Sequence, residues 1–380
     1  MTYTDAIVLT PGKQNSFRKS TVAVSEPGPG ELVLDVVAVG ICGTDAEICE
    51  GLYGEAPDGQ DELVLGHESL CRVVGAEKGD GVFKPGDLVV PIVRRPCPEL
   101  CPACAVGRWD ECISGHYHEH GIKGLDGFLR GRLTLGADAV VRVPQGLGEL
   151  AVLTEPLTIV EKALERALQI HNAPGHPGTG LVTGAGPVGM LAAMLLKSRG
   201  LDVYVVDRRP ADSKKARFVE AMGAHYVDDT SQPLEKAGPP GGFDIGLEAT
   251  GYAPLVFRAL SALAKNGVLA LTGVTGGHHS LEVDVNLMNS TMVLENQAMV
   301  GSVNAARAHY ERAVQDLAGF GIQFPGLLEQ LITARYSLDD FDKALEKGPD
   351  DIKTIVSLNA APAGHSPDGG SAPHASGQGH

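Results

Sequence analysis

Short apolar runs separated by glycine and proline characterise the chain up to about residue 155. They are rich in valine, as in "ELVLDVVAVG" (31–40), "KPGDLVVPIV" (84–93) and "ADAVVRVPQG" (137–146). Runs of β-branched residues bounded by turn-forming residues are typical of antiparallel strands. The first part of the chain therefore predicts an irregular β domain.

From about residue 178 to 305 the pattern changes to strands that alternate with helices. Strand-like runs such as "DVYVVD" (202–207) and "GVLALTGV" (267–274) are separated by helical patterns such as "PVGMLAAMLLKSRG" (187–200). This alternation predicts a parallel sheet wrapped by helices, which is an α/β architecture. A helical stretch at 304–317 follows, and the strand-like "DIKTIVSL" (351–358) is expected to return to the first domain.

These changes predict the domain boundaries. We expect residues 1–159, completed by 306–360, to form the β domain, and residues 160–305 to form the α/β domain. Residues 361–380 contain few large apolar groups and predict a disordered tail.

Composition narrows the possible partners. The 380 residues include 47 acidic and 31 basic side chains, for a net charge of -16, which argues against binding to nucleic acid or to an anionic membrane surface. We find neither a basic leader nor an apolar segment of the ~20 residues that a bilayer span requires, and therefore expect a cytoplasmic protein. In a reducing compartment, the seven cysteines indicate metal binding or catalysis more than disulfides.

A glycine-rich loop follows the first predicted strand of the α/β domain. Gly184, Gly186 and Gly189 form a G-x-G-x-x-G pattern that continues into a helix through Pro187 and Val188. Such glycines allow a tight turn, close approach to a pyrophosphate and close packing of helix on strand. A glycine turn without a ligand is the alternative, and the acid 18 residues after Gly189 weighs against it, because it can accept hydrogen bonds from an adenosine ribose. The loop predicts a Rossmann domain that binds a dinucleotide.

The choice between NAD and NADP depends on "VVDRRP" (205–210). Asp207 favours NAD by binding the ribose hydroxyls and repelling a 2′-phosphate. Arg208 and Arg209 can pair with that phosphate, although solvated surface arginines are an equally good interpretation. We expect use of both cofactors, with a modest preference for NAD.

Two separate sets of side chains could bind metal. Cys42, His67 and Glu68 form the kind of donor set that zinc accepts when a position stays open for water or substrate, although a buried thiol and a hydrogen-bonded turn histidine are the simpler interpretations of the first two. The second set lies within sixteen residues and predicts a closed structural zinc site, with a reduced, metal-free lobe as the alternative. It consists of Cys97, Cys101, Cys104 and Cys112, whereas Cys49 and Cys71 are expected to be packing residues.

The motifs "GICGTD" (40–45), "GHES" (66–69), "KPGDLVV" (84–90) and "GAGPVG" (184–189) resemble those of the zinc-dependent medium-chain dehydrogenases over about residues 1–360. The resemblance implies a GroES-like catalytic domain before the Rossmann domain. It also implies that Cys42, His67 and Glu68 ligate a catalytic zinc and that Thr44 passes a proton outward. Because neighbouring residues on a regular strand point to opposite faces, His67 and Glu68 can both ligate only if the backbone bends, and Gly66 makes such a bend possible. The family's structural lobe has the spacing C-x2-C-x2-C-x7-C, and here the first gap is one residue longer.

Three further segments resemble the archaeal-type glucose dehydrogenases within that family. "LTEPLTIVEKA" (153–163) has Glu155 where a second cysteine ligand is usual, and the other two segments are "GIKGLDGF" (121–128) and "VGSVN" (300–304). The resemblance implies that Glu155 ligates zinc directly or through water, and that Glu119 and Asn304 bind sugar hydroxyls together with Thr44 and Glu155. From the residues alone, Glu119 could be a solvated loop acid and Asn304 a helix N-cap. Thr250 and Val303 are assigned to the cofactor site.

The resemblance implies zinc-dependent oxidation of D-glucose at C1 to the lactone, with two zinc ions per chain and NAD or NADP. A homo-oligomer, dimer or tetramer, is expected. The alternatives are a related polyol or secondary-alcohol dehydrogenase, and a nicotinamide-binding zinc protein without turnover.

Overall fold

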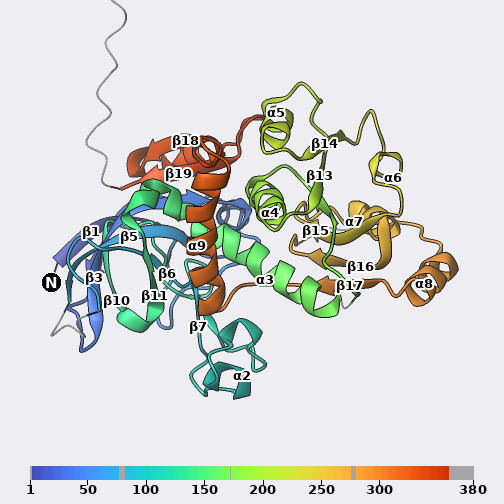
Figure 1. Cartoon of the computed structure of the whole chain (residues 1–380). Helices are drawn as coiled ribbons and strands as arrows, with labels where there is room; N and C mark the ends of the chain where they lie inside the picture. The colour runs from blue at the N-terminus through green and yellow to red at the C-terminus, as the bar shows by residue number, and fades with distance from the viewer. Residues whose placement is uncertain (1, 77–81, 172, 275–279, 359–380) are drawn as a thin grey trace, which may run out of the picture.

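Strand β3 (Glu31–Ile41) is the centre of the N-terminal half in the computed structural model, which describes residues 2–76, 82–171, 173–274 and 280–358 (Figure 1). The predicted tail at 361–380 lies outside these residues. β3 alternates buried and half-buried positions up to Ala38, as expected for a strand with one face in the core, and is fully buried from there to Ile41. It lies in a seven-stranded sheet of order β11-β6-β5-β3-β19-β18, with β10 also paired to β3. The other strands of this sheet are β5 (Glu68–Ala76), β6 (Leu88–Pro91), β10 (Arg132–Gly136), β11 (Val140–Val143), β18 (Ile332–Ser337) and β19 (Lys353–Ser357). Of these, β5, β10 and β19 pair directly with β3.

The C-terminal strand β19 returns to this N-terminal sheet. It pairs antiparallel with β3, with Thr354 opposite Ile41 and Ser357 opposite Ala38. Two smaller sheets complete this half, in the orders β2-β1-β4 and β7-β8-β9. Their strands are β1 (Thr2–Leu9), β2 (Arg18–Val24), β4 (Leu63–Val64), β7 (Arg94–Arg95), β8 (His118–His120) and β9 (Gly124–Leu125).

The other half is a six-stranded, wholly parallel sheet of order β14-β13-β12-β15-β16-β17. This is the doubly wound order, which reverses direction between the first and fourth strands and leaves a ligand crevice at their carboxyl ends. Its strands are β12 (Thr179–Thr183), β13 (Asp202–Asp207), β14 (His225–Asp228), β15 (Phe243–Glu248), β16 (Leu263–Leu271) and β17 (Ala298–Gly301). Its helices are α4 (Pro187–Ser198), α5 (Lys214–Ala221), α6 (Leu234–Ala237), α7 (Ala253–Ser261) and α8 (Val285–Leu294).

Two long helices, α3 (Thr154–Ile170) and α9 (Arg307–Gln323), lie between the two halves (Figure 1). One cluster of buried apolar residues runs from Leu70 of β5 through Ala163 of α3 and Val314 of α9 to Val182 of β12. The two halves therefore share a hydrophobic core, and α3 contributes side chains to both. In the described residues, we find no helix that combines the length and the apolar character needed to cross a bilayer.

Candidate functional site

Cys42 directly follows the buried end of β3 and contacts His67. Cys42 is the N-cap of α1 (Gly43–Cys49), where its Sγ accepts a hydrogen bond from the Thr44 amide at 3.2 Å. Its Sγ also lies 3.2 Å from Nε2 of His67. His67 follows Gly66, whose φ of +90° and whose close contact with Leu129 require a glycine. The expected backbone bend is therefore present between β4 and β5.

Asp45 contacts both Cys42 and His67. Its Oδ2 accepts the Cys42 amide at 2.9 Å, its Oδ1 lies 3.4 Å from Nδ1 of His67, and its side chain is fully buried. Burial lowers the pKa of His67, but the charges and hydrogen bonds of Cys42 and Asp45 outweigh burial and raise that pKa well above its ordinary value. The site thus favours a cation between Sγ and Nε2, and a thiolate with an imidazole is a donor set that suits zinc.

Two glutamates complete the donor group. Ligand atoms of His67, Glu68 and Glu155 lie within 4.8 Å of one another, as do those of Cys42, Asp45 and His67. Glu155 is contributed by the first turn of α3, and burial, opposed by His67 and reinforced by Glu68, raises its pKa to about 7. The four residues that the sequence assigned to the catalytic zinc therefore belong to two overlapping groups that share His67.

Lys353 is a site residue that the sequence analysis missed. Its Nζ lies 2.5 Å from Oε2 of Glu68, and both side chains are almost completely buried. A Cβ on Gly40 would lie 2.1 Å from the same Oε2, so a glycine at this position leaves room for the carboxylate. The available signal was a single lysine within the apolar strand "DIKTIVSL".

Tyr53 was also missed, and it lies near Thr44. Burial raises the pKa of Tyr53 to about 12, and a hydrogen bond with Thr44 opposes this shift. The charges of Cys42 and His67 also act on the pKa of Tyr53, in opposite directions. Its ring is partly exposed, so Tyr53 connects the site with solvent.

The four-cysteine lobe projects from the N-terminal half and carries α2 (Pro102–Ala105) (Figure 1). The thiols of all four lobe cysteines lie within 4.8 Å of one another, and none of the seven cysteines, all of them described, forms a disulfide. Backbone amides of Cys104 and Ile113 lower the pKa of Cys101 to about 6, whereas burial raises that of Cys104 to about 12. Four converging thiols, one already poised as a thiolate, suit a closed zinc site.

Leu100 explains how the lobe tolerates its longer first gap. The residue is exposed, has a positive φ of 46°, and donates its amide to the Cys97 carbonyl at 3.0 Å. The additional residue forms an outward turn, and Cys97 and Cys101 still converge: the Cys101 amide donates to Cys97 Sγ at 3.2 Å.

A cavity of about 840 Å³ opens at the switch point of the parallel sheet. Of the predicted cofactor residues, Gly184, Gly186, Asp207, Arg208, Arg209 and Thr250 line it. Asp207 ends β13, and its Oδ2 accepts the Ala185 amide of the glycine-rich loop at 2.8 Å. A Cβ on Gly189 would lie 1.8 Å from the Gly184 carbonyl, so this glycine permits close packing of helix on strand. Pro187, Val188 and Gly189 begin α4, and Val303 lies outside the lining of this cavity.

Glu119 and Asn304 contact each other directly. Asn304 Nδ2 donates to Glu119 Oε1 at 2.6 Å, and Arg94 Nε donates to the same oxygen at 3.0 Å. Glu119 is buried, so it is not a solvated loop acid, and the N-cap of α9 is Ala306, so Asn304 is not that cap. Burial raises the pKa of Tyr310 well above its ordinary value, and the charges of Glu155 and Glu119 both add to this rise.

Cys49 and Cys71 are packing residues, as expected. Both are buried in the apolar core of the N-terminal half. Burial raises the pKa of each thiol to about 12, which makes both unreactive.

Comparison with known proteins identifies the family. The chain matches the model of the alcohol dehydrogenase GroES-like domain over residues 28–145 and that of the glucose dehydrogenase C-terminus over residues 148–358, more than half of its 380 residues. The chain belongs to the glucose dehydrogenase family. Its relatives include the glucose 1-dehydrogenases of Thermoproteus tenax, 42% identical over 355 residues, and Methanocella arvoryzae, 39% identical over 357 residues; each alignment covers 93% of this chain and 99% of the relative.

A solved structure supports the same family. The glucose dehydrogenase of Haloferax mediterranei, in complex with NADP, Zn and gluconolactone, superposes with a TM-score of 0.84 at 34% identity, covering 94% of this chain and 100% of that chain. The predicted α/β fold, a GroES-like domain with a Rossmann domain, is thereby confirmed, as is the resemblance to the zinc-dependent medium-chain dehydrogenases.

Proposed function

We propose that this chain is a zinc-dependent glucose 1-dehydrogenase that oxidises D-glucose at C1 to the lactone and reduces NAD or NADP. The observation that carries the proposal is the grouping of Cys42, Glu68 and Glu155 around His67, together with the hydrogen bond of Asn304 to the buried Glu119. Similarity to glucose 1-dehydrogenases over 93% of the chain supports it. In this reaction the C1 hydroxyl loses its proton and C1 transfers a hydride to the nicotinamide, which yields lactone, reduced cofactor and one proton.

The catalytic zinc would be held by Cys42, His67 and Glu68, with Glu155 bound directly or through water, and Lys353 would stay paired to Glu68. When bound, zinc supplies a Lewis acid that withdraws electron density from a hydroxyl oxygen. Thr44 Oγ1 accepts the hydroxyl proton of the sugar and passes it to Tyr53, toward solvent. With a pKa raised to about 12, Tyr53 keeps its own proton at neutral pH and can relay a proton without becoming a charged group in the site.

The Glu119–Asn304 pair would select the sugar by its hydroxyls. Glu119 Oε2 has no hydrogen-bond partner among the described residues and can accept from a hydroxyl. A site built around such groups discriminates strongly against an analogue that lacks the hydroxyl, because its own buried polar atoms are then left unpaired.

The decisive experiment is an assay with aldoses, polyols and simple alcohols, with each cofactor, and identification of the product. We expect lactone from D-glucose and poor turnover of simple alcohols. Preferred turnover of a polyol or a secondary alcohol, with no lactone from any aldose, would instead support the alternative dehydrogenase. Absence of turnover with every substrate, in protein that retains zinc and binds cofactor, would support a non-catalytic role.

The cofactor would bind in the cavity at the switch point, and both NAD and NADP are expected to serve. Asp207 faces the cavity with Arg208 and Arg209 beside it, so a ribose hydroxyl and a 2′-phosphate each find a partner. Asp207→Asn should shift the ratio of kcat/KM values toward NADP, and Arg208→Ala should shift it toward NAD. An unchanged ratio in both variants would place the adenosine ribose elsewhere.

The four-cysteine lobe would hold a second, structural zinc. The converging thiols support this assignment, and the outward turn at Leu100 removes the objection raised by the longer first gap. Elemental analysis should find about two zinc ions per chain when both sites are filled.

A homo-oligomer is also proposed. β17 ends the order of the parallel sheet, so one of its edges can pair with a second copy. The adjacent α8 exposes Val285, Leu287, Val293 and Leu294, an apolar surface that a second copy would cover. Light scattering should give a mass above that of a monomer, and Leu294→Glu should lower it, whereas Ile322→Glu, at an exposed apolar residue of α9, should not. A monomeric wild type would contradict this proposal.

A further inference from the structure

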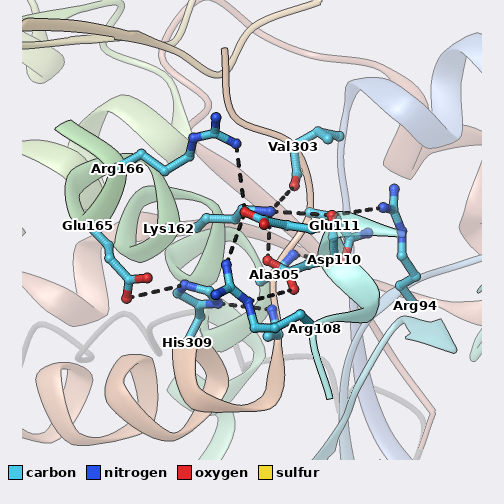
Figure 2. Close-up of polar contacts among 12 residues, drawn as sticks. Arg94, Arg108, Asp110, Glu111, Lys162, Glu165, Arg166, Val303, Ala305 and His309 are labelled. Carbon is cyan, nitrogen blue, oxygen red and sulfur yellow. Dashed lines mark hydrogen bonds and ion pairs between the residues drawn. The ribbon is translucent and has the colours of Figure 1, made fainter. Parts of the chain in front are cut away.

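A buried lysine joins three segments of the molecule that are distant in sequence (Figure 2). Lys162 lies on α3 and is almost completely buried. Its Nζ lies 2.7 Å from Oδ2 of Asp110 and donates to the carbonyls of Asp110 at 3.3 Å and of Val303 at 3.0 Å. The ammonium group thus makes two hydrogen bonds and one ion pair.

Asp110 ties this contact to the four-cysteine lobe. It lies two residues before Cys112, in a 3-10 turn at Trp109–Glu111, and its carboxylate is fully buried. Arg108 Nε lies 3.5 Å from Oδ1 of Asp110, which helps to fix the carboxylate from the side of the lobe. The position of Asp110 therefore depends on the folding of the lobe.

Arg94 connects Asp110 with Glu119. Its Nη1 donates to the Asp110 carbonyl at 3.2 Å, and its Nε donates to Glu119 Oε1 at 3.0 Å. Because the same Oε1 accepts from Asn304, and Asn304 follows Val303, the contacts form a closed ring. The ring runs from Asp110 through Lys162 to Val303 and Asn304, and back through Glu119 and Arg94.

The segment held by Lys162 needs external support. Asn304 has a positive φ of 58°, a left-handed conformation that most side chains avoid and that asparagine adopts more readily than other residues with a side chain. It lies in the connection between β17 and α9, outside any helix or strand. The Val303 carbonyl belongs to the peptide group that begins Asn304, so the hydrogen bond from Lys162 fixes the peptide plane from which the Asn304 side chain projects.

We propose that Lys162 and Arg94 are positioning residues through which the four-cysteine lobe holds Asn304 and Glu119 in the geometry that binds the sugar. This inference rests on the proposed sugar-binding role of Asn304 and Glu119. It gives the lobe a function in substrate affinity in addition to stability.

The test compares two basic residues of α3 that both face the lobe. Lys162→Met should raise KM for glucose about tenfold, since a small displacement of a positioned group weakens binding, while KM for the cofactor and kcat change less than twofold. Arg166→Met is the matched control: Arg166 lies 3.9 Å from Glu111 of the lobe and has no contact with Val303 in the described residues. This control should leave KM for glucose unchanged.

Lys162→Met leaves the buried carboxylate of Asp110 with Arg108, at 3.5 Å, as its remaining cation, and this loss can prevent the single variant from accumulating as folded protein. The double variant Lys162→Met/Asp110→Asn removes that charge and should show the same rise in KM. An unchanged KM in a folded variant, with only a lower melting temperature, would mean that the ion pair is structural and would overturn the inference.

Asn304→Ala separates this inference from the proposed function. If the inference is correct, Asn304→Ala raises KM for glucose and Lys162→Met adds little to it in the double variant, because both act through one side chain. Fully additive effects would overturn the inference and leave the proposed function intact. An unchanged KM in Asn304→Ala would overturn the sugar role and the inference together.

Discussion

The two groups of metal-ligand side chains differ in composition and in surroundings. The group at Cys42 combines a thiol, an imidazole and carboxylates, and contains charged neighbours that shift one another's pKa values. The lobe group has four identical thiols, and backbone amides are the main influence on the pKa of one of them, Cys101. Mixed donors near a substrate pocket suit an ion that exchanges a ligand, whereas four thiols suit an ion that stays closed. The residues around the ligands of a metal site therefore indicate whether the metal has a catalytic or a structural role.

The largest expected effect is on activity, at the mixed group. His67→Ala should lower kcat/KM by about 10³-fold or more, because the Lewis acid contributes several kcal/mol to the transition state. The melting temperature should fall only as far as the buried Asp45 carboxylate is destabilised, because Asp45 loses the imidazole and keeps the Cys42 amide. The measurement is steady-state kinetics together with zinc content, which should fall by about one ion per chain. Full activity in a metal-free preparation would contradict the catalytic role of the group at Cys42.

The opposite result is expected in the lobe. Cys104→Ser should lower the free energy of unfolding by about 4 kcal/mol or more through loss of a structural metal, while kcat at saturating glucose stays within about tenfold. Denaturation and zinc analysis of the purified variant would measure this. Cys49→Ala, which removes a thiol outside both groups, should keep two zinc ions. Alkylation of all four lobe cysteines in the native enzyme would show that no metal closes the lobe.

Lys353 tests whether the mixed group also contributes to stability. Lys353→Met leaves Glu68 buried without its partner, which should cost about 3–5 kcal/mol of unfolding free energy. Lys343→Met is the matched control, because Lys343 pairs with Asp340 at the surface, where such a pair contributes about 0–1 kcal/mol. Chemical denaturation would compare the two. The variant Lys353→Met/Glu68→Gln should recover part of the loss, and an equal, small effect of both single variants would contradict the buried pairing.

Local motifs predicted much of this molecule, and distant contacts explain the remainder. "GICGTD", "GHES" and the glycine-rich loop are continuous segments whose chemistry depends on adjacent residues, so Cys42, His67 and Gly184 were identified from the sequence. Lys353 lies 285 residues from Glu68, and its role depends on the pairing of β19 with β3. Spacing along the chain carries no signal for such a contact.

The four-cysteine lobe and the Glu119–Asn304 pair also could not be fully predicted from the sequence. The longer first cysteine gap weakened the sequence pattern, and only the backbone turn at Leu100 shows how the thiols still converge. Glu119 and Asn304, 185 residues apart, could each be interpreted as an ordinary surface or capping residue until their hydrogen bond was observed. Burial, which a single sequence does not state, excluded the solvated interpretation of Glu119.

The smallest expected effect lies on α3, the helix that carries Glu155 at the mixed group and Lys162 against the lobe. Burial, reinforced by a hydrogen bond with Asp316, raises the pKa of Glu161 from 4.5 to about 8. The folded protein therefore binds one more proton than the unfolded chain between these values, so this residue's contribution to stability is fully present below pH 4.5 and is lost as the pH rises to 8. Glu161→Gln should be about 1–3 kcal/mol more stable than the wild type at pH 8, with a difference that vanishes near pH 4.5. Urea denaturation across this range would measure it, with Glu329→Gln at an exposed site as the control. Glu161 is not a ligand of either group, so zinc content should be the same in variant and wild type. A stability difference independent of pH would show that Glu161 does not hold the additional proton.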